Sequence, residues 1–446
     1  MEESQQFNNE LGTITLNMEK NISLSSPLKR ITVLDALRGF ALLGVILMHM
    51  LQHFGIGSLP SQQEALRFPA LDEAIQWIGS NIIMGRFINI FAFLFGLSFF
   101  IQMDRAAKKG IDFRGRFVWR MIILLAMGLL SHSFYHVEII SVYAFFGLLL
   151  LPLYRVKTWW LMILVFFFLL GGPRIIQSVH HNKNLAVEQP GIEEQITNVQ
   201  ASRSLPEHLK NPSFFNSAKH NYEERLQTKL NYQFGLFGRG YVTFALFVLG
   251  LVIGRIRFFE KVDEQKKQNR ALFIGFVLTT ILITVVQNLA PPVDIRTLFR
   301  PDGEYISSSL LIVKALDDVS LALFTASLTM GFILLYQTRK FGKYLEVLSP
   351  YGRTALTNYI MQGVIGSLIF SLWAFGPTFG NWGASALFFF GIIIYIVQGV
   401  ISKYWIKFYL YGPLEWLWRS ATYLELQPFR RKERNDKILR SKKVVG

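Results

Sequence analysis

The chain has 446 residues, of which 51% are hydrophobic, 15% aromatic and only 17% charged, and its formal net charge is +16. Soluble domains carry about 25% charged residues, so this composition excludes an ordinary soluble protein and favours a membrane protein. No cysteine is present, which excludes disulfides, a thiolate nucleophile and cysteine-bound metals. The positive residues cluster beside apolar segments, so we interpret them as determinants of membrane orientation and not as a nucleic-acid surface.

Residues 1–30 are polar and aperiodic, and we expect a disordered cytoplasmic tail there. Hydrophobic segments follow that are long enough to span a bilayer, since about 20 apolar residues cover about 30 Å of hydrocarbon. We expect about ten such helices, five within 31–179 and five within 234–405: 34–54, 82–103, 117–135, 137–154, 157–178, 234–254, 271–290, 309–336, 353–375 and 383–404. The intervening stretch 68–80 is too short and polar to cross, and is expected at the membrane interface.

Charge in the connections predicts orientation. Lysine and arginine are concentrated in alternate connections and at the C-terminal end: 105–120, 255–270, 339–343 and 403–446. The connection 55–81 instead has one arginine against three acidic residues, and 376–382 has no charge. Because positive loops stay in the cytoplasm, both termini are predicted to be cytoplasmic. The fold class is therefore an all-α, multi-pass bundle of about ten transmembrane helices.

Two segments differ from this pattern. Residues 180–233 form a long connection of mixed charge, for which we leave open a partly ordered extracytoplasmic cap or disorder. Residues 406–426 contain Trp416, Trp418 and Tyr423 among lysines and arginines, which predicts an amphipathic helix at the headgroup level. Pro413 after Gly412 is placed to begin that helix, and the basic tail follows to residue 446.

The first span carries a polar face that lipid would not tolerate. Asp35, Arg38, His49 and His53 fall on one stripe of a helix. Arg38 and His49 are eleven residues apart, which places them on the same face about 16 Å from each other. Costly polar groups on a spanning helix face protein or water, and they usually mark a functional site. The competing interpretation is that Arg38 reaches the interface while His49 bonds a neighbouring helix.

Further polar groups lie near the ends of later spans. His132, His136 and Glu138 cluster after the third span. The histidine pair suits a metal, but a fixed third ligand is missing, so we predict no metal. Glu138 has either an acidic role in a site or a helix-capping role. Arg239 lies at a membrane boundary. Extension of its side chain to the interface explains its position as well as contact with a ligand does.

Lys314, Asp317 and Asp318 lie inside the eighth span, where they can neutralise one another. The same group would also suit a proton path. It is therefore the main support for the alternative function, a small-molecule transporter or permease with an intramembrane polar path. A structural or signalling membrane protein is a third possibility.

At the cytoplasmic start of the ninth span and in the C-terminal helix, polar side chains are close enough in sequence to frame an entrance on the inner side. Structural packing is the competing interpretation. The residues are Arg353, Asn358, Tyr359, Gln362, Glu415 and Arg419.

Five motifs occur in order along the chain: LDALRGF at 34–40, FAFLFG at 91–96, LFVLGLVIGR at 246–255, GRTALTNY at 352–359 followed by Gln362, and GPLEWLWRSATY at 412–423. Together they closely resemble the YeiB family of bacterial membrane proteins of unknown function. That family is distantly similar to the transmembrane acyltransferases, which include the acyltransferase-3 and heparan-glucosaminide acetyltransferase groups. The first helix of the acyltransferase-3 group carries a basic residue, ten residues, then a histidine, and Arg38 and His49 match that pattern.

The resemblance implies a membrane-bound acyltransferase of the bacterial plasma (inner) membrane. It would move an acetyl or similar acyl group from cytoplasmic acyl-CoA to a carbohydrate or envelope acceptor. His49 would be the base or a transient acyl carrier, and Arg38 would anchor the donor, with His53 and Glu138 in the same pocket. The six residues of the inner entrance would bind the donor. The resemblance implies no metal and leaves a homodimer open.

Overall fold

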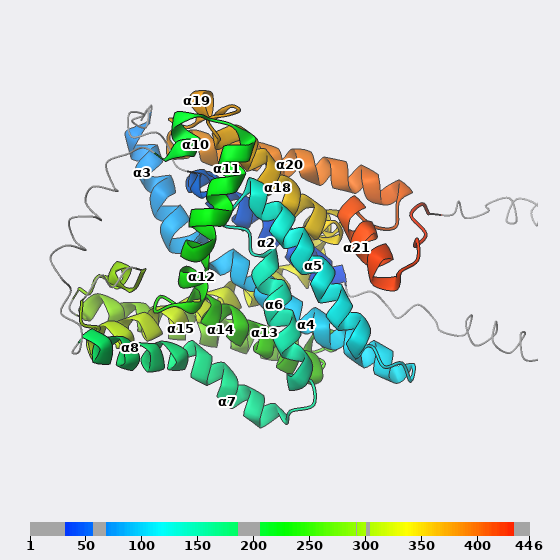
Figure 1. Cartoon of the computed structure of the whole chain (residues 1–446). Coiled ribbons are helices and arrows are strands. Elements are labelled where there is room, and N and C mark those ends of the chain that lie inside the picture. The colour runs from blue at the N-terminus through cyan, green and yellow to red at the C-terminus, as the bar shows by residue number, and fades with distance from the viewer. Residues whose placement is uncertain (1–31, 57–67, 186–205, 291, 300–303, 432–446) are drawn as a thin grey trace, which may run out of the picture. The chain divides into compact units, whose positions relative to one another are not determined.

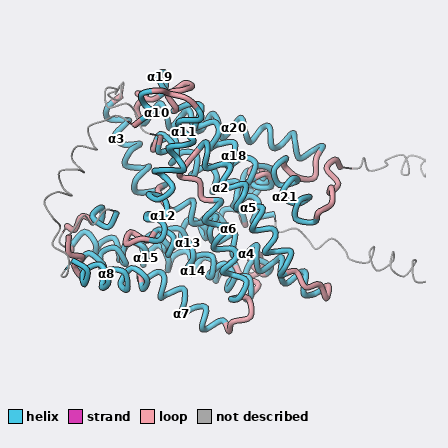
Figure 2. The backbone as a smooth tube through the Cα atoms, viewed as in Figure 1, coloured by secondary structure: helices cyan, strands magenta, loops and turns pink. Residues whose placement is uncertain are grey.

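The computed structural model describes residues 32–56, 68–185, 206–290, 292–299 and 304–431. The predicted tails at 1–30 and beyond 431, and residues 186–205 of the long connection, lie outside the described residues. Within the described residues the regular structure is helical, apart from one isolated bridge between Tyr409 and Arg430 (Figure 2). The all-α prediction is therefore confirmed for the described part of the chain.

The first half contains α2 (Thr32–Leu51), α3 (Pro69–Ile78), α4 (Arg86–Lys108), α5 (Arg114–Phe134), α6 (Ile140–Leu153), α7 (Thr158–Leu169) and α8 (Gly172–Leu185). The second half contains α10 (Glu207–Lys210), α11 (Phe214–His220), α12 (Leu226–Phe234), α13 (Arg239–Arg255), α14 (Lys266–Leu289), α15 (Ser308–Tyr336), α16 (Arg339–Glu346), α17 (Ser349–Arg353), α18 (Ala355–Phe370), α19 (Gly376–Phe379), α20 (Ala384–Phe408) and α21 (Pro413–Tyr423). Short 3₁₀ or π turns join them at 53–55, 79–83, 221–225, 258–260 and 295–299.

Six of these helices are long and apolar enough to cross a membrane, and eight candidate spans result if two bent pairs are each counted once. The pairs are α7 with α8, bent by 46°, and Phe214–Phe234 with α13, bent by 58°. Figure 1 shows the bend between α7 and α8. Each of the ten predicted segments overlaps a helix, but α6 and α18 have only 14 and 16 residues. A multi-pass membrane protein is thus supported, with six to eight candidate spans by length and composition.

The elements outside the predicted spans take defined positions. The stretch 68–80 contains α3, which continues through a π turn towards α4. The Asp72 carboxylate of α3 accepts a 2.7 Å hydrogen bond from the Ser385 amide at the start of α20. Gly412 and Pro413 begin α21, as predicted. Residues 206–234, here named the cap segment, form α10, α11, a π turn and α12, so this part of the long connection is ordered.

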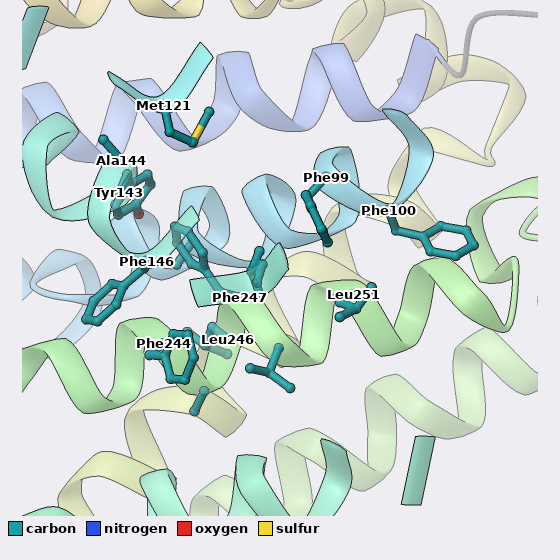
Figure 3. Close-up of a cluster of buried hydrophobic side chains, with 14 of the residues drawn as sticks. Phe99, Phe100, Met121, Tyr143, Ala144, Phe146, Phe244, Leu246, Phe247 and Leu251 are labelled. Atoms are coloured by element: carbon teal, nitrogen blue, oxygen red, sulfur yellow. The ribbon is translucent and has the colours of Figure 1, made fainter. Parts of the chain in front are cut away.

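The apolar core lies where α4, α5, α6, α7 and α13 meet (Figure 3). Phe247 of α13 contacts Tyr143 of α6 with ring centroids 4.9 Å apart, and Phe146 contacts Phe244 at 5.2 Å. The backbones of α4 and α13 touch at glycines. A Cβ atom on Gly96 would lie 1.9 Å from the Phe247 carbonyl oxygen, and one on Gly250 would lie 2.1 Å from that of Phe93. Small residues allow such approach in lipid, where packing drives helix association.

This contact makes a prediction about stability. Gly250→Ala should lower the free energy of unfolding by about 1–3 kcal/mol, because the added methyl group meets backbone that cannot turn away. Gly275→Ala on α14 is the matched control: a Cβ there has nothing within 4 Å, so better helix propensity should leave stability equal or higher. Thermal unfolding of the two proteins in detergent tests this. Equal losses for both variants would contradict the close packing.

Candidate functional site

Arg38 and His49 lie at opposite ends of α2, a helix whose residues are mostly buried. The Arg38 guanidinium donates to Asp35 Oδ1 at 2.9 Å and to Ser98 Oγ of α4 at 2.6 Å. Its side chain keeps 26% exposure, so it remains reachable. Arg38 thus joins α2 to α4, and the shared face predicted for Arg38 and Asp35 is present as an ion pair.

His49 has a hydrogen-bonding partner on another helix. The Tyr135 hydroxyl, at the end of α5, is 2.7 Å from His49 Nδ1, the nearer of the two ring nitrogens. Phe54 packs against both rings, with centroids 5.3 Å from each. Which group donates depends on the imidazole tautomer, but the bond orients the ring in either case. His53 lies beyond the helix end at φ 49°, with its ring edge-on to Phe370.

The turn between α5 and α6 carries a buried ion pair. Glu138 is only 1% exposed, and its carboxylate binds the Lys229 ammonium of α12. The same carboxylate accepts from Ser141 Oγ at 2.5 Å and from the Ser141 amide at 3.0 Å. Lys229 Nζ also donates to Ser141 Oγ at 2.9 Å. Glu138 therefore caps the start of α6, which is the capping role weighed for it, and it also holds α12 through Lys229.

Tyr359 belongs to this turn and not to the predicted inner entrance. Its hydroxyl accepts a 3.1 Å hydrogen bond from the Ile139 amide, next to Glu138. Tyr135 precedes Glu138 by three residues, and the Glu138 amide bonds its carbonyl. His49, Tyr135, Glu138 and Tyr359 therefore line one buried region, and Lys229 closes it from the cap segment.

The cap segment is fixed to α5 by further polar contacts. His132 Nε2 lies 3.0 Å from the backbone carbonyl oxygen of Asn221. The side-chain amide of Asn221 donates to the backbone carbonyls of His132 and Ser133, both at 3.1 Å. His208 and His220 stack with ring centroids 3.8 Å apart. Among the residues that the structure describes, no group of three metal-type ligands is present, and His132 serves as a docking residue.

Asn358 and Gln362 lie in a separate buried polar layer between α17, α18 and α20. Asn358 Nδ2 donates to Ser402 Oγ at 3.0 Å. Gln362 Nε2 donates to the Tyr351 hydroxyl at 2.9 Å, and that hydroxyl donates to Gln398 Oε1 at 2.7 Å. Such side-chain bonds between helices stabilise packing inside a membrane. This layer is the packing role that was weighed against donor binding.

Glu415 caps a helix. Its carboxylate accepts from the amides of Leu356 and Thr357 at 2.7 and 3.1 Å and from Thr357 Oγ1 at 2.6 Å, which satisfies the first turn of α18. Burial raises the pKa of Glu415, and these hydrogen bonds oppose the rise. Arg353 donates weakly to the Leu410 carbonyl at 3.3 Å. Glu415 thereby joins α21 to α18, and Arg353 joins α17 to the chain that leads into α21.

Arginines stack on aromatic rings where α21 meets α5. Arg419 lies 5.0 Å from the centroid of Tyr411, and Arg120 lies 3.7 Å from that of Trp418. The Nε atoms of both arginines are buried, and no described residue forms a hydrogen bond with them. Two guanidinium groups with free donors suit phosphate groups.

The structure therefore divides the predicted site residues. It brings His49, Glu138 and Tyr359 to one region, and it places Arg38, the Asn358–Gln362 layer and the α21 contacts elsewhere. Sequence reasoning missed Tyr135, Ser141, Lys229 and Arg120. Lys229 was hidden in a connection without periodicity, although an ammonium opposite a buried glutamate is the partner that Glu138 requires.

Comparison with known proteins agrees with part of the resemblance. Residues 253–425 match the family described as "Protein of unknown function (DUF418)". This is the family of YeiB-like proteins. The chain is 26% identical over 435 residues to "Uncharacterized protein YxaH" of Bacillus subtilis (strain 168), covering 91% of this chain and 97% of the relative. It is also 26% identical over 410 residues to "Uncharacterized 39.9 kDa protein in amylase 3'region" of Bacillus acidopullulyticus, covering 92% and 98%. None of these descriptions states an activity.

The ion pair predicts strong coupling between two positions. Lys229→Met and Glu138→Gln should each lower the free energy of unfolding by about 3 kcal/mol, because each leaves the other partner buried without its pair. The double variant should lose clearly less than the sum. A double-mutant cycle measured by chemical unfolding in detergent checks this, and additive losses would rule out the pair.

The α5–α6 turn also predicts a pH dependence. Burial, with the nearby Arg225, His132, His220 and Lys229, lowers the pKa of His136 to about 3. The unfolded chain binds a proton near pH 6.5, and the folded protein does not until about pH 3, so stability falls as the pH drops through this window. The expected slope is up to about 1.4 kcal/mol per pH unit. His136→Asn should flatten it in unfolding measurements between pH 7 and 5, and an unchanged slope would show that His136 is already charged in the folded protein.

Proposed function

We propose that this protein is a membrane-bound acyltransferase that moves an acetyl or similar acyl group from cytoplasmic acyl-CoA to a carbohydrate or envelope acceptor. The observation that carries the proposal is the partly buried His49, whose Nδ1 lies 2.7 Å from the Tyr135 hydroxyl of the helix end that leads into the Glu138–Lys229 ion pair. The Tyr135 hydroxyl lies 2.7 Å from Nδ1 and 3.1 Å from Nε2. In the proposed reaction it bonds the nearer Nδ1, and Nε2 takes the substrate proton.

The reaction follows from these groups. His49 takes the proton of the acceptor hydroxyl or amine as its oxygen or nitrogen attacks the thioester carbonyl. The carbon–sulfur bond then breaks, and the coenzyme A thiolate leaves with the proton from His49. Tyr135 keeps the imidazole in place throughout. Tyr359, whose hydroxyl accepts from the Ile139 amide of the same turn, would donate its own proton in a hydrogen bond to the carbonyl oxygen.

Donor binding is proposed at the end of the bundle where α21 packs on α5. The unpartnered Nε atoms of Arg120 and Arg419 fit the phosphates of coenzyme A. Arg38, partly exposed on α2, is the cation between that end and His49. Arg353 and Glu415 shape this end through their contacts with the chain around α21.

We also propose the topology that this function requires. If α6, α18 and the two bent pairs each cross the bilayer, the chain has ten spans with both termini in the cytoplasm, as the charge of the connections favours. The membrane would be the bacterial inner membrane. The transporter alternative has weaker support, because Asp318 is paired with both Arg174 and Lys314 and such a neutralised carboxylate does not favour a proton path.

Acyl-CoA binding and turnover by the full-length protein in detergent test the proposal. Wild-type protein should bind acetyl-CoA saturably and hydrolyse its thioester slowly. His49→Gln should lower turnover by about 10²–10⁴-fold with little effect on binding, since it removes the base. Arg38→Ala should weaken binding. His181→Gln, on the exposed part of α8, is the matched control and should change neither. Well-folded protein that binds no acyl-CoA would contradict the proposal.

A further inference from the structure

Two helices at one end of the bundle begin with an arginine. Arg86 is the first residue of α4, and Arg239 is the first residue of α13. The preceding Gly85 and Gly238 adopt left-handed conformations and provide no side-chain cap, and neither first turn contains an acidic residue. A helix N-terminus already carries partial positive charge, so a cation there is unfavourable unless an anion compensates it.

Neither arginine has a carboxylate partner among the described residues. Arg239 is 8% exposed, and its Nη2 donates to the Gly85 carbonyl at 3.1 Å and to Asn89 Oδ1 at 2.6 Å. Its Nη1 is buried and has no hydrogen-bond partner within the described part of the chain. Arg86 Nη1 donates to the carbonyls of Ser80 and Met84, and its Nε is likewise buried without a partner in the ranges that the structure describes. All of these acceptors are neutral.

The neighbouring charges leave this end positive. Arg86 interacts electrostatically with Asp317 and Arg239. Asp317 and Asp318 are themselves engaged by Lys314, and Asp318 also by Arg174. Two carboxylates, those of Asp317 and Asp318, therefore face four cations: Arg86, Arg174, Arg239 and Lys314. Burying uncompensated charge in a low dielectric is expensive, and a bound anion would remove the cost.

We infer that Arg86 and Arg239, at the adjoining starts of α4 and α13, bind a phosphate-type oxyanion. Arginine forks and helix N-termini are both suited to phosphate oxygens. The neutral Asn89 beside Arg239 is consistent with this, because a carboxylate there would already supply the counter-charge. Arg86 is only partly buried, and the adjacent Met84 is 41% exposed, so the anion can approach from outside the bundle. The site is separate from the acyl-transfer proposal and does not depend on it.

A charge-compensation experiment tests the site. The full-length protein in detergent is unfolded thermally in sodium phosphate or sodium chloride of equal ionic strength, and in mixed micelles containing phosphatidylglycerol or phosphatidylcholine. Wild-type protein should show a saturable rise in Tm with free phosphate, with the anionic lipid, or with both. The two arms identify whether a soluble or a lipid phosphate is the source.

Asn89→Asp is the decisive variant, because it places a carboxylate on Arg239 without changing side-chain size. It should raise Tm without added anion. It should also raise, at least tenfold, the anion concentration at which half of the Tm increase is reached. Arg257→Gln removes an arginine that already has Asp104 and Glu260 as partners at the opposite end of α13, and it should keep the response. Absence of any response in wild-type protein, or a full response in Asn89→Asp, would overturn the inference.

Discussion

The Glu138–Lys229 ion pair is the interaction on which the arrangement of the candidate site depends. Glu138 cannot remain buried as a charge unless a cation reaches it, and the cation comes from a segment almost a hundred residues later in the chain. Once Lys229 is in place, α12 must lie against the α5–α6 turn. The α5–α6 turn then orients Tyr135 towards His49 and presents the Ile139 amide to Tyr359.

A second constraint is the backbone contact between α4 and α13. The glycines at this contact let the two backbones approach closely, and the starts of the two helices adjoin, so that Arg239 reaches the Gly85 carbonyl next to Arg86. The same core extends to α5 and α6 through phenylalanines that meet edge to face, Phe99 with Phe117 and Phe247 with Phe146. Figure 3 shows Phe99, Phe146 and Phe247 in this core. The close backbone contact between these two apolar helices therefore also sets where the arginines at their first turns lie.

The sequence predicted what depends on local pattern. Helices occur in all ten apolar segments, and the start of α21 at Pro413 is as expected. The predicted polar face of α2 holds for Asp35, Arg38 and His49, but the helix ends at Leu51 and does not include His53. The breaks at Gly171 and Gly238 were not anticipated, because one residue with positive φ leaves the apolar pattern unchanged on both sides. The partners of His49 and Glu138 were also missed. Tyr135 and Lys229 reach them from other elements, and nothing near His49 or Glu138 in the chain indicates those contacts.

The short α6 has a consequence for the surrounding lipid. Its 14 residues rise about 21 Å, while a hydrocarbon core measures about 30 Å. If α6 ends at one boundary of that core, the turn at Tyr135–Glu138, which directly precedes α6, lies well below the other boundary. The bilayer would then thin locally, or protein would occupy the space above the turn, where Lys229 brings α12. The distance that a water-soluble acceptor would travel to His49 is then shorter than the membrane is thick.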